Sequence, residues 1–329
     1  MKKFLFFIIA FTSVFQIKAS AFEKVIIWGH KLHSHTHSYI HNAFYRAFKE
    51  MGYSTFWFDN SDELSNFDFS NSLFLTEGQA DSRIPLREDC FYLVHNPSST
   101  KYKSLKENQY LTFQVYTKDV LSRPTAKKID TCIYTDLDNK CVYMPWATDL
   151  LPNEIEIYKK EAIKLFPKLG NLTSEKSIFW VGTIGGGCFG NIEEISPFQK
   201  ACEENGITFI QKTGLSMKES EKFIRQSFIA PTIVGTWQKE KGYVPCRIFK
   251  NISYGKMGVT NSETIYELFE GKIVYNPNTY QLFYEAKEKL KSMKKQDLIE
   301  IMDIVKNKHT YINRIQLLLD FMKEVENNY

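Results

Sequence analysis

The sequence predicts an α/β protein made of two Rossmann-like domains in tandem, followed by a helical tail. The first observation is an apolar strand at residues 24–28, a helix at 38–51 and a strand at 55–58, an order that opens a parallel, doubly wound sheet. The second is that the same order begins again at residue 177. The third is the length of 329 residues, which is enough for two domains with separate cores.

The composition is that of a globular protein, since 43% of the residues are hydrophobic and 24% are charged. The formal net charge of +4 is too small to argue for a nucleic-acid partner. Aromatic residues make up 15% of the chain, and many fall within the expected strands and helices. We therefore assign most of them to the core.

The first residues have the layout of a secretory signal. Lys2 and Lys3 precede an apolar run at residues 4–15, and a region with small residues follows, with cleavage expected at 19–21. The run is shorter than the roughly 20 residues of a transmembrane helix. An uncleaved signal-anchor is the alternative, and in either case we exclude residues 1–21 from the fold.

The first domain is expected to span residues 22–170. Its further strands are expected at residues 72–76, 90–95, 111–116 and 141–144. A segment bounded by two prolines, 145–152, leaves this sheet, and a helix at 154–166 leads to the stretch 167–171. This stretch is the best place for a domain boundary.

The second domain is expected to span residues 171–329. Its strands are expected at residues 177–181, 207–211, 229–234, 257–260 and 272–275. Its helices are expected at residues 193–205, 216–227, 245–255, after 261, and from 279 to the end.

One stretch, residues 242–262, has the features of an anion site. Pro245 begins a helix that Gly255 ends, and Arg247 and Lys250 lie near its start. Two fixed cations beside the N–H groups of a helix start favour an anion, and a phosphate above all. The alternative is an ordinary amphipathic helix with exposed basic residues.

The pattern P-x-R-I-F-K-x4-G at residues 245–255, followed by G-V-T at 258–260, resembles the donor-binding segment of GT-B glycosyltransferases. In that fold a helix and the next strand clamp the diphosphate of a nucleotide sugar. GT-B enzymes consist of two Rossmann-like domains with closing helices, so the resemblance covers nearly the whole chain after residue 21 and is specific in its second half.

The resemblance implies a glycosyltransferase of glycan biosynthesis that moves a sugar from a nucleotide-sugar donor to a hydroxyl acceptor without a metal or other cofactor. Lys250 and Gly242 stand where many retaining members have acidic residues, so their E-x7-E signature is absent and inversion is expected. The residues implied to bind the donor are Gly182, Gly185, Gly186, Gly187, Arg247, Lys250, Gly255, Thr260, Asn261 and Ser262.

The loop at residues 182–190 is rich in glycine. Gly185, Gly187 and Gly190 nearly match the dinucleotide pattern G-x-G-x-x-G, but the next strand ends in Gln211 without an acidic residue. In GT-B enzymes this loop lies against the donor phosphates, where absent side chains let backbone N–H groups approach an anion. We expect such contact, and a merely tight turn is the alternative.

Five of the seven histidines lie within twelve residues, directly after the first strand, where doubly wound folds bind ligands. His33-Ser-His35 is similar to the first motif of PHP phosphoesterases, and the spacing from His33 to His37 is similar to that of metallo-β-lactamases. Both families need several more ligands, and only His95 and His309 remain downstream. A metal-dependent hydrolase is therefore the weaker alternative.

Several inverting GT-B families keep a histidine in this loop as general base for the acceptor hydroxyl, and a near-neutral pKa suits that role. The resemblance implies His37 as the base, ahead of His35 and His41. His37 and His41 share a helix face because they are four residues apart. The candidates for acceptor contacts are His33, Glu77 and His95.

Other polar signals have simpler interpretations. Asp136-x-Asp138 matches the metal-binding D-x-D of the other glycosyltransferase class, but it lies in a polar turn with Asn139, where aspartate is expected for turn chemistry alone. The six cysteines include no C-x-x-C pair. We expect buried thiols, with a disulfide between Cys132 and Cys141 as the alternative that export would permit.

The expected partners are a nucleotide-sugar donor and a glycan, lipid or protein acceptor, with membrane association through the N-terminus. Because nucleotide sugars are cytosolic or organellar, the signal predicts retention at a membrane or in a donor-supplied secretory lumen, and a periplasmic location stays open. The rival function is a sugar- or nucleotide-binding protein that keeps the fold and lacks the chemistry, since Lys250 replaces an acidic residue.

Overall fold

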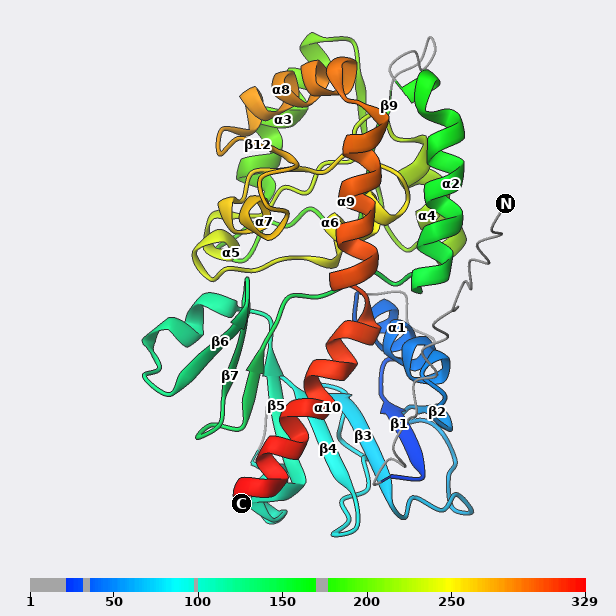
Figure 1. The fold of residues 1–329 in the computed structure, drawn as a ribbon, viewed down its shortest axis with the longest axis vertical. Coiled ribbons are helices and arrows are strands. Elements are labelled where there is room, and N and C mark those ends of the chain that lie inside the picture. Colours follow the sequence, from blue (N-terminus) through cyan, green and yellow to red (C-terminus); the bar gives the residue numbers. More distant parts are fainter. Residues whose placement is uncertain (1–21, 32–35, 98–99, 170–176) are drawn as a thin grey trace, which may run out of the picture.

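The structure, a computed structural model, describes residues 22–31, 36–97, 100–169 and 177–329 and has two lobes (Figure 1). One lobe holds the large sheet and the C-terminal helix, and the other holds two pairs of parallel strands and most of the helices. The expected α/β fold of two tandem Rossmann-like domains with a helical tail is confirmed.

The expected signal or signal-anchor lies outside the described residues. Within the described part of the chain, no helix combines the length and the apolar character that crossing a membrane requires.

The first domain is built on an eight-stranded sheet with the order β2-β1-β3-β4-β5-β8-β7-β6. Strands β1 to β5 and β8 are parallel, and β6 and β7 form an antiparallel edge. The strands are Lys24–Trp28 (β1), Thr55–Phe58 (β2), Ser72–Glu77 (β3), Phe91–His95 (β4), Tyr110–Gln114 (β5), Ala126–Asp130 (β6), Ile133–Asp136 (β7) and Cys141–Tyr143 (β8).

The parallel strands form where apolar runs predicted them, because strands buried on both faces need continuous apolar sequence. The hairpin of β6 and β7 was not expected. Strand β6 is exposed along nearly its whole length and carries Lys127 and Lys128, so it lacks the apolar pattern that marks a strand.

The two faces of this sheet are covered differently. Helix α1 (Thr36–Glu50) and helix α10 (Tyr311–Asn328) pack on one face, where Phe44 meets Tyr311 with ring centroids 4.5 Å apart. In the described chain the other face is covered by aromatic side chains of irregular segments, such as Phe67, and by 3-10 turns. The 3-10 helices of this domain are Lys101–Ser104 (η1), Glu107–Gln109 (η2) and Thr117–Ser122 (η3).

The second domain is built around β9 (Ser177–Val181), which pairs in parallel with β10 (Thr208–Lys212). Strand β11 (Val259–Thr260) pairs with β12 (Val274–Tyr275), and residues 228–234 lie between these pairs. The N–H of Phe228 donates to Ser177 O at 2.8 Å, and the N–H of Thr232 donates to Val259 O at 2.8 Å. The order across the sheet is therefore β10, β9, residues 228–234, β11 and β12.

The strand expected at residues 229–234 is wrong as a regular strand, because this segment is extended but makes one isolated bridge, from Thr232 to Thr260. Pro231 has no N–H to donate to a ladder. At Val234 the side chain of Asn261 replaces the ladder, since its amide accepts from and donates to the Val234 backbone, both at 2.9 Å.

The remaining helices follow the expected order, with one short addition, α5. They are Pro152–Leu169 (α2), Ile192–Glu204 (α3), Met217–Gln226 (α4), Thr236–Glu240 (α5), Cys246–Ser253 (α6), Glu263–Leu268 (α7), Thr279–Ser292 (α8) and Lys295–Lys308 (α9).

In its described residues the chain passes between the lobes twice: at residues 145–152, the first passage, and between α9 and α10, the second passage. Helix α2 precedes the boundary expected at residue 170, yet it packs on α9 of the second domain, with Lys159 Nζ 2.7 Å from Asp303 Oδ1. Helix α10 returns to the first domain. The two passages lie side by side, because the N–H of Thr148 donates to His309 O at 3.0 Å and Thr148 bridges Thr310.

The Arg314 guanidinium holds both passages and is buried. It donates to Pro145 O at 2.8 Å and Trp146 O at 3.1 Å in the first passage, and to Lys308 O at 3.1 Å in the second. It also lies 3.1 Å from His309 Nδ1. Burial lowers the pKa of Arg314 to about 10, so it stays cationic at neutral pH.

Two weaker sequence signals are structural. All six cysteines are free thiols, and Cys132 and Cys141 are both buried without a disulfide. Asp136 is fully buried and accepts hydrogen bonds from Thr125 Oγ1 at 3.0 Å and Asn139 Nδ2 at 2.8 Å, so it stabilises the turn that was expected there.

We expect Arg314→Met to lower the free energy of unfolding by roughly 3 kcal/mol or more. Each buried carbonyl left without a donor costs about 1–3 kcal/mol, and the substitution leaves several. Urea denaturation followed by circular dichroism measures the effect, with Lys323→Met on the exposed face of the same helix as the control. Equal stability of the two variants would contradict this role of Arg314.

Acid should destabilise the same junction. Burial, and then the charges of Arg314 and Lys308, hold the pKa of His309 well below 6.5. The folded state therefore keeps His309 neutral while the unfolded chain takes up a proton, so this contribution to stability is present above pH 6.5 and lost as the pH falls below it. Unfolding free energies measured from pH 8 to pH 5 should fall less steeply for His309→Gln than for the parent, and parallel curves would refute the assignment.

Candidate functional site

In both domains, the strand that comes first along the chain lies in space between the two extended segments that follow it in the sequence. β1 lies between β2 and β3, and β9 lies between β10 and residues 228–234. In this topology the connections leave the first strand in opposite directions, and ligands bind in the crevice at its carboxyl end. The predicted histidine loop and the predicted glycine-rich loop follow these two strands.

A cavity of about 570 Å³ lies at the carboxyl end of β9, a size typical of small-molecule sites. Its walls come from both domains, since Thr36 and Tyr39 of α1 face Gly182 and the start of α6. The Tyr39 hydroxyl also donates to the backbone carbonyl of Leu215. The first domain therefore closes one side of the cavity in the second.

Arg247, on the first turn of α6, projects into this cavity. Its guanidinium lies over the Trp180 ring at 3.7 Å and donates to Val181 O at 3.0 and 3.3 Å. Gly182 has a φ of +123°, a backbone conformation that favours glycine, and a Cβ there would lie 2.6 Å from Arg247 Nη2, so the guanidinium would have to move. The structure thus brings Arg247 next to Gly182, the first residue of the glycine-rich loop.

The charge of Arg247 has no carboxylate partner among the described residues. Burial lowers its pKa to about 10, which leaves it cationic at neutral pH. Because an unpaired cation in a confined space is costly, an anion entering the cavity would be stabilised there.

The sequence predicted Arg247 and Lys250 as two cations available to an anion, but in the structure Lys250 is already paired with a carboxylate. Its ammonium lies 3.3 Å from Asp149 Oδ2 and 4.9 Å from the centroid of the Tyr39 ring. Burial alone would lower the pKa of Lys250, but the charge of Asp149 outweighs it and raises the pKa. Lys250 lines the cavity as half of an ion pair, and Asp149, from the first passage, was not among the predicted site residues.

Some glycines of the glycine-rich loop line the cavity, and another forms the tight turn that was the alternative. Gly182 and Gly185 line the cavity, whereas Gly186 and Gly187 are exposed, with space around them. Gly190 is needed for a tight turn, because a Cβ there would lie 2.1 Å from Gly185 O.

The other predicted donor residues lie away from this cavity. Gly255 ends α6 at a φ of +84°, and a Cβ there would lie 2.7 Å from Ala162 Cβ of α2. Thr260, Asn261 and Ser262 are buried, and Asn261 uses its amide to bond to the Val234 backbone. In the described structure their hydrogen bonds serve the fold of the second sheet.

A second group of polar side chains lies at the carboxyl ends of β1, β3 and β4. His30 Nε2 is 3.1 Å from Glu77 Oε2, and the N–H of Gln79 donates to the same oxygen at 3.0 Å. Burial alone would raise the pKa of Glu77, but the hydrogen bonds from His30 and Gln79 lower it, so Glu77 is ionised.

His37 lies among these groups, half-buried in the first turn of α1. Its ring centroid is 5.1 Å from that of His30, 5.7 Å from that of His95 and 6.4 Å from that of Trp146. Trp146 also interacts with Tyr243, a residue of the cavity wall. The group of His30, His37, Glu77 and His95, here called the histidine cluster, therefore adjoins the cavity. The structure thus brings together the predicted His37, Glu77 and His95.

The other predicted histidines have different places. His41 is buried and donates from Nδ1 to Gly29 O at 2.8 Å, and burial lowers its pKa to about 3. That geometry makes it a neutral residue that fixes the loop. His33 and His35 lie outside the described residues.

Sequence reasoning missed several residues of this region. Asp149 and Trp146 lie in the passage at residues 145–152, which the sequence marked only as a domain exit. Trp180 looked like a core residue of β9, and His30 like one histidine among five. The one available signal was the density of polar and aromatic side chains just after apolar strands.

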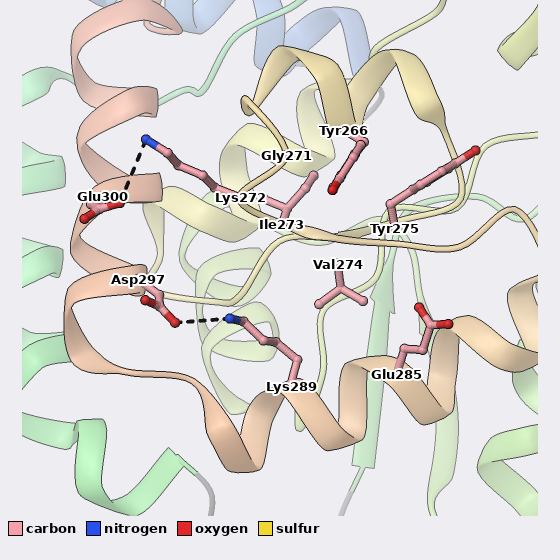
Figure 2. Close-up of a pocket in the computed structure, with 10 residues that line it drawn as sticks. All are labelled: Tyr266, Gly271, Lys272, Ile273, Val274, Tyr275, Glu285, Lys289, Asp297 and Glu300. Carbon is pink, nitrogen blue, oxygen red and sulfur yellow. Dashed lines mark hydrogen bonds and ion pairs between the residues drawn. The ribbon is translucent and has the colours of Figure 1, made fainter.

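A further cavity of about 530 Å³ lies on the second domain between β12, α8 and α9 (Figure 2). Its cations are paired, since Lys289 lies 3.1 Å from Asp297 and Lys272 lies 3.9 Å from Glu300. It therefore lacks the unmatched charge that distinguishes the cavity beside Arg247.

No protein-family model and no curated protein matches the chain. Among solved structures, it is similar to an α1,3-fucosyltransferase, with 12% identity and a TM-score of 0.45 over 94% of this chain and 91% of that one. It is also similar to a UDP-forming α,α-trehalose-phosphate synthase from Burkholderia xenovorans, with 8% identity and a TM-score of 0.44 over 78% and 74%. Both similarities are distant.

Proposed function

We propose that the protein is a glycosyltransferase that binds a nucleotide-sugar donor in the cavity beside Arg247. The observation that carries this proposal is the unmatched guanidinium, which lies at the carboxyl end of β9 next to Gly182, whose missing side chain leaves room for it. A diphosphate supplies the charge that this cation lacks. The predicted pattern at residues 245–255 supports a sugar nucleotide over other phosphates.

Donor binding in this proposal needs no metal ion. Arg247 neutralises the diphosphate as its negative charge grows on departure, which is the task that a divalent cation performs elsewhere. Lys250 contributes less than a free cation because Asp149 already balances it. Its role is to hold α6 against Tyr39 of the first domain.

The acceptor is a hydroxyl group of a glycan, lipid or protein that enters from the histidine cluster. His37 takes the hydroxyl proton while the acceptor oxygen attacks the anomeric carbon. The bond from that carbon to the diphosphate breaks, and the bonding electrons leave with the diphosphate. Attack from the face opposite the leaving group inverts the anomeric centre. Ionised Glu77 stabilises the imidazolium that forms on His37, since both lie in one cluster.

The rival is a binding protein that recognises the same donor and transfers nothing. It is favoured by one observation, the ion pair of Lys250 with Asp149, because this pair occupies a position that is acidic in the resembling enzymes. The two hypotheses share donor binding and differ in the fate of the sugar.

Arg247→Ala should weaken binding of a nucleoside diphosphate by about ten- to a hundredfold, because a charge-assisted contact contributes roughly 1.5–3 kcal/mol. A thermal-shift screen with UDP and GDP, followed by titration calorimetry in EDTA, measures this. Arg225→Ala is the matched control, since Arg225 lies in the same domain and pairs with Glu161 and Glu221 at the surface. Parent-like affinity of Arg247→Ala would show that the cavity has been misassigned.

His37→Ala should leave nucleotide affinity nearly unchanged while sugar transfer falls by about 10²–10⁴-fold, the usual contribution of a general base. The assay follows release of nucleoside diphosphate from UDP- and GDP-sugars with a panel of hydroxyl acceptors. Normal transfer by His37→Ala places the base elsewhere, with His35 next to test. Tight donor binding by a parent that transfers to none of the acceptors favours the binding-protein rival.

A further inference from the structure

The histidine cluster contains more imidazole and carboxylate groups than general acid–base catalysis requires. One ligand atom from each of His30, His37 and Glu77 lies within 4.8 Å of the others. Two neighbouring groups are buried without hydrogen-bond partners: both ring nitrogens of His95 and Oε1 of Glu77. His95 is 7% exposed and Glu77 is 1% exposed, so neither uses solvent as a substitute. Buried polar atoms that remain unpartnered indicate a missing ligand.

The backbone is shaped to bring these groups together. Gly29 has a φ of +90°, and a Cβ there would lie 2.4 Å from Ala80 Cβ. His30 adopts a φ of +58°, which is unusual for a residue other than glycine. Such conformations are costly and collect at functional sites. Here the turn directs the His30 ring from the end of β1 to the Glu77 carboxylate at the end of β3.

Further contacts orient the ligands from outside. The Gln79 N–H donates to Glu77 Oε2, and His41 donates to Gly29 O, the residue before His30. In metal sites, hydrogen bonds of this kind orient the side chains that bind the ion.

We propose that His30, His37 and Glu77 bind a divalent transition metal ion of the Zn²⁺ class, with His95 placed to complete the coordination. Imidazole nitrogens with one carboxylate are donors that Zn²⁺ prefers, whereas Mg²⁺ and Ca²⁺ prefer sites built from oxygen. Metal–nitrogen bonds of about 2.0–2.1 Å require the ligand atoms to approach one another more closely. The half-buried His37 provides that movement.

The site has a consequence that rests on the proposed function. An ion bound to the His37 nitrogen occupies the lone pair that would accept the hydroxyl proton. Zn²⁺ should therefore inhibit sugar transfer while leaving donor binding at Arg247 unchanged, and a chelator should restore transfer. The protein then needs no metal for catalysis and is inhibited by one.

The test measures metal binding directly. The full chain, freed of metal with a chelator, is titrated with Zn²⁺ by calorimetry and with Co²⁺ by visible absorption. We expect one equivalent to bind, with Mg²⁺ at the same concentration giving no signal. Glu77→Gln should weaken binding by more than about a hundredfold, given that losing even an outer-shell partner costs 10–100-fold. Glu50→Gln, an exposed carboxylate in the same domain, should bind like the parent.

Glu77→Gln keeps every histidine, so it separates this site from binding by histidines alone. Parent-like Zn²⁺ affinity in that variant, or no Zn²⁺ binding by the parent, overturns the proposal. If Glu77→Gln fails to fold by circular dichroism, His37→Asn in the half-buried first turn of α1 replaces it with the same expectation. Metal binding without any nucleotide binding would refute the glycosyltransferase and leave the metal site standing.

Discussion

The buried guanidinium of Arg314 is the contact on which the arrangement of the two domains depends. It bonds to carbonyl groups of both passages between the lobes, at Pro145 and Trp146 on one side and at Lys308 on the other. A buried cation is tolerated because the guanidinium donates to three carbonyl oxygens and also lies 3.1 Å from His309 Nδ1. The first passage also carries Trp146 and Asp149, which contact the histidine cluster and Lys250. By fixing the two passages, Arg314 therefore also fixes the position of the histidine cluster relative to the cavity beside Arg247.

The cavity depends on an electrostatic asymmetry within a single helix. Arg247 and Lys250 are three residues apart on α6, and one is left unpaired while the other meets Asp149. A carboxylate beside Arg247 as well would neutralise the charge that attracts an anion. Stacking on Trp180 and bonds to the Val181 carbonyl hold Arg247 in place without neutralising its charge. The unmatched charge is thus available to a ligand.

The two parts of the site come from equivalent places in the two sheets. Each lies at the carboxyl end of a first strand, where the connections diverge. Helix α1 joins them, because His37 lies in the histidine cluster and Tyr39, two residues on, lines the cavity. A ligand that spans both would touch groups on one helix, which suits the proposed transfer.

The sequence by itself determined the strands β1, β2 and β9, because short apolar runs between polar connections predict buried strands. It also identified Arg247 and the histidine loop, since both follow local signals, a helix start and a strand end. It failed for residues 229–234, where Pro231 lacks an N–H to donate and the Asn261 side chain bonds to the backbone in place of a neighbouring strand. It also failed for β6, which has no apolar face. Only the tertiary structure decided which charges are paired. Asp149 is 101 positions before Lys250, and Glu77 is 47 after His30. The pair of His30 with Glu77 is set by how the strands of the first sheet are ordered, and the pair of Lys250 with Asp149 by how the chain passes between the domains. Local sequence carries no record of either.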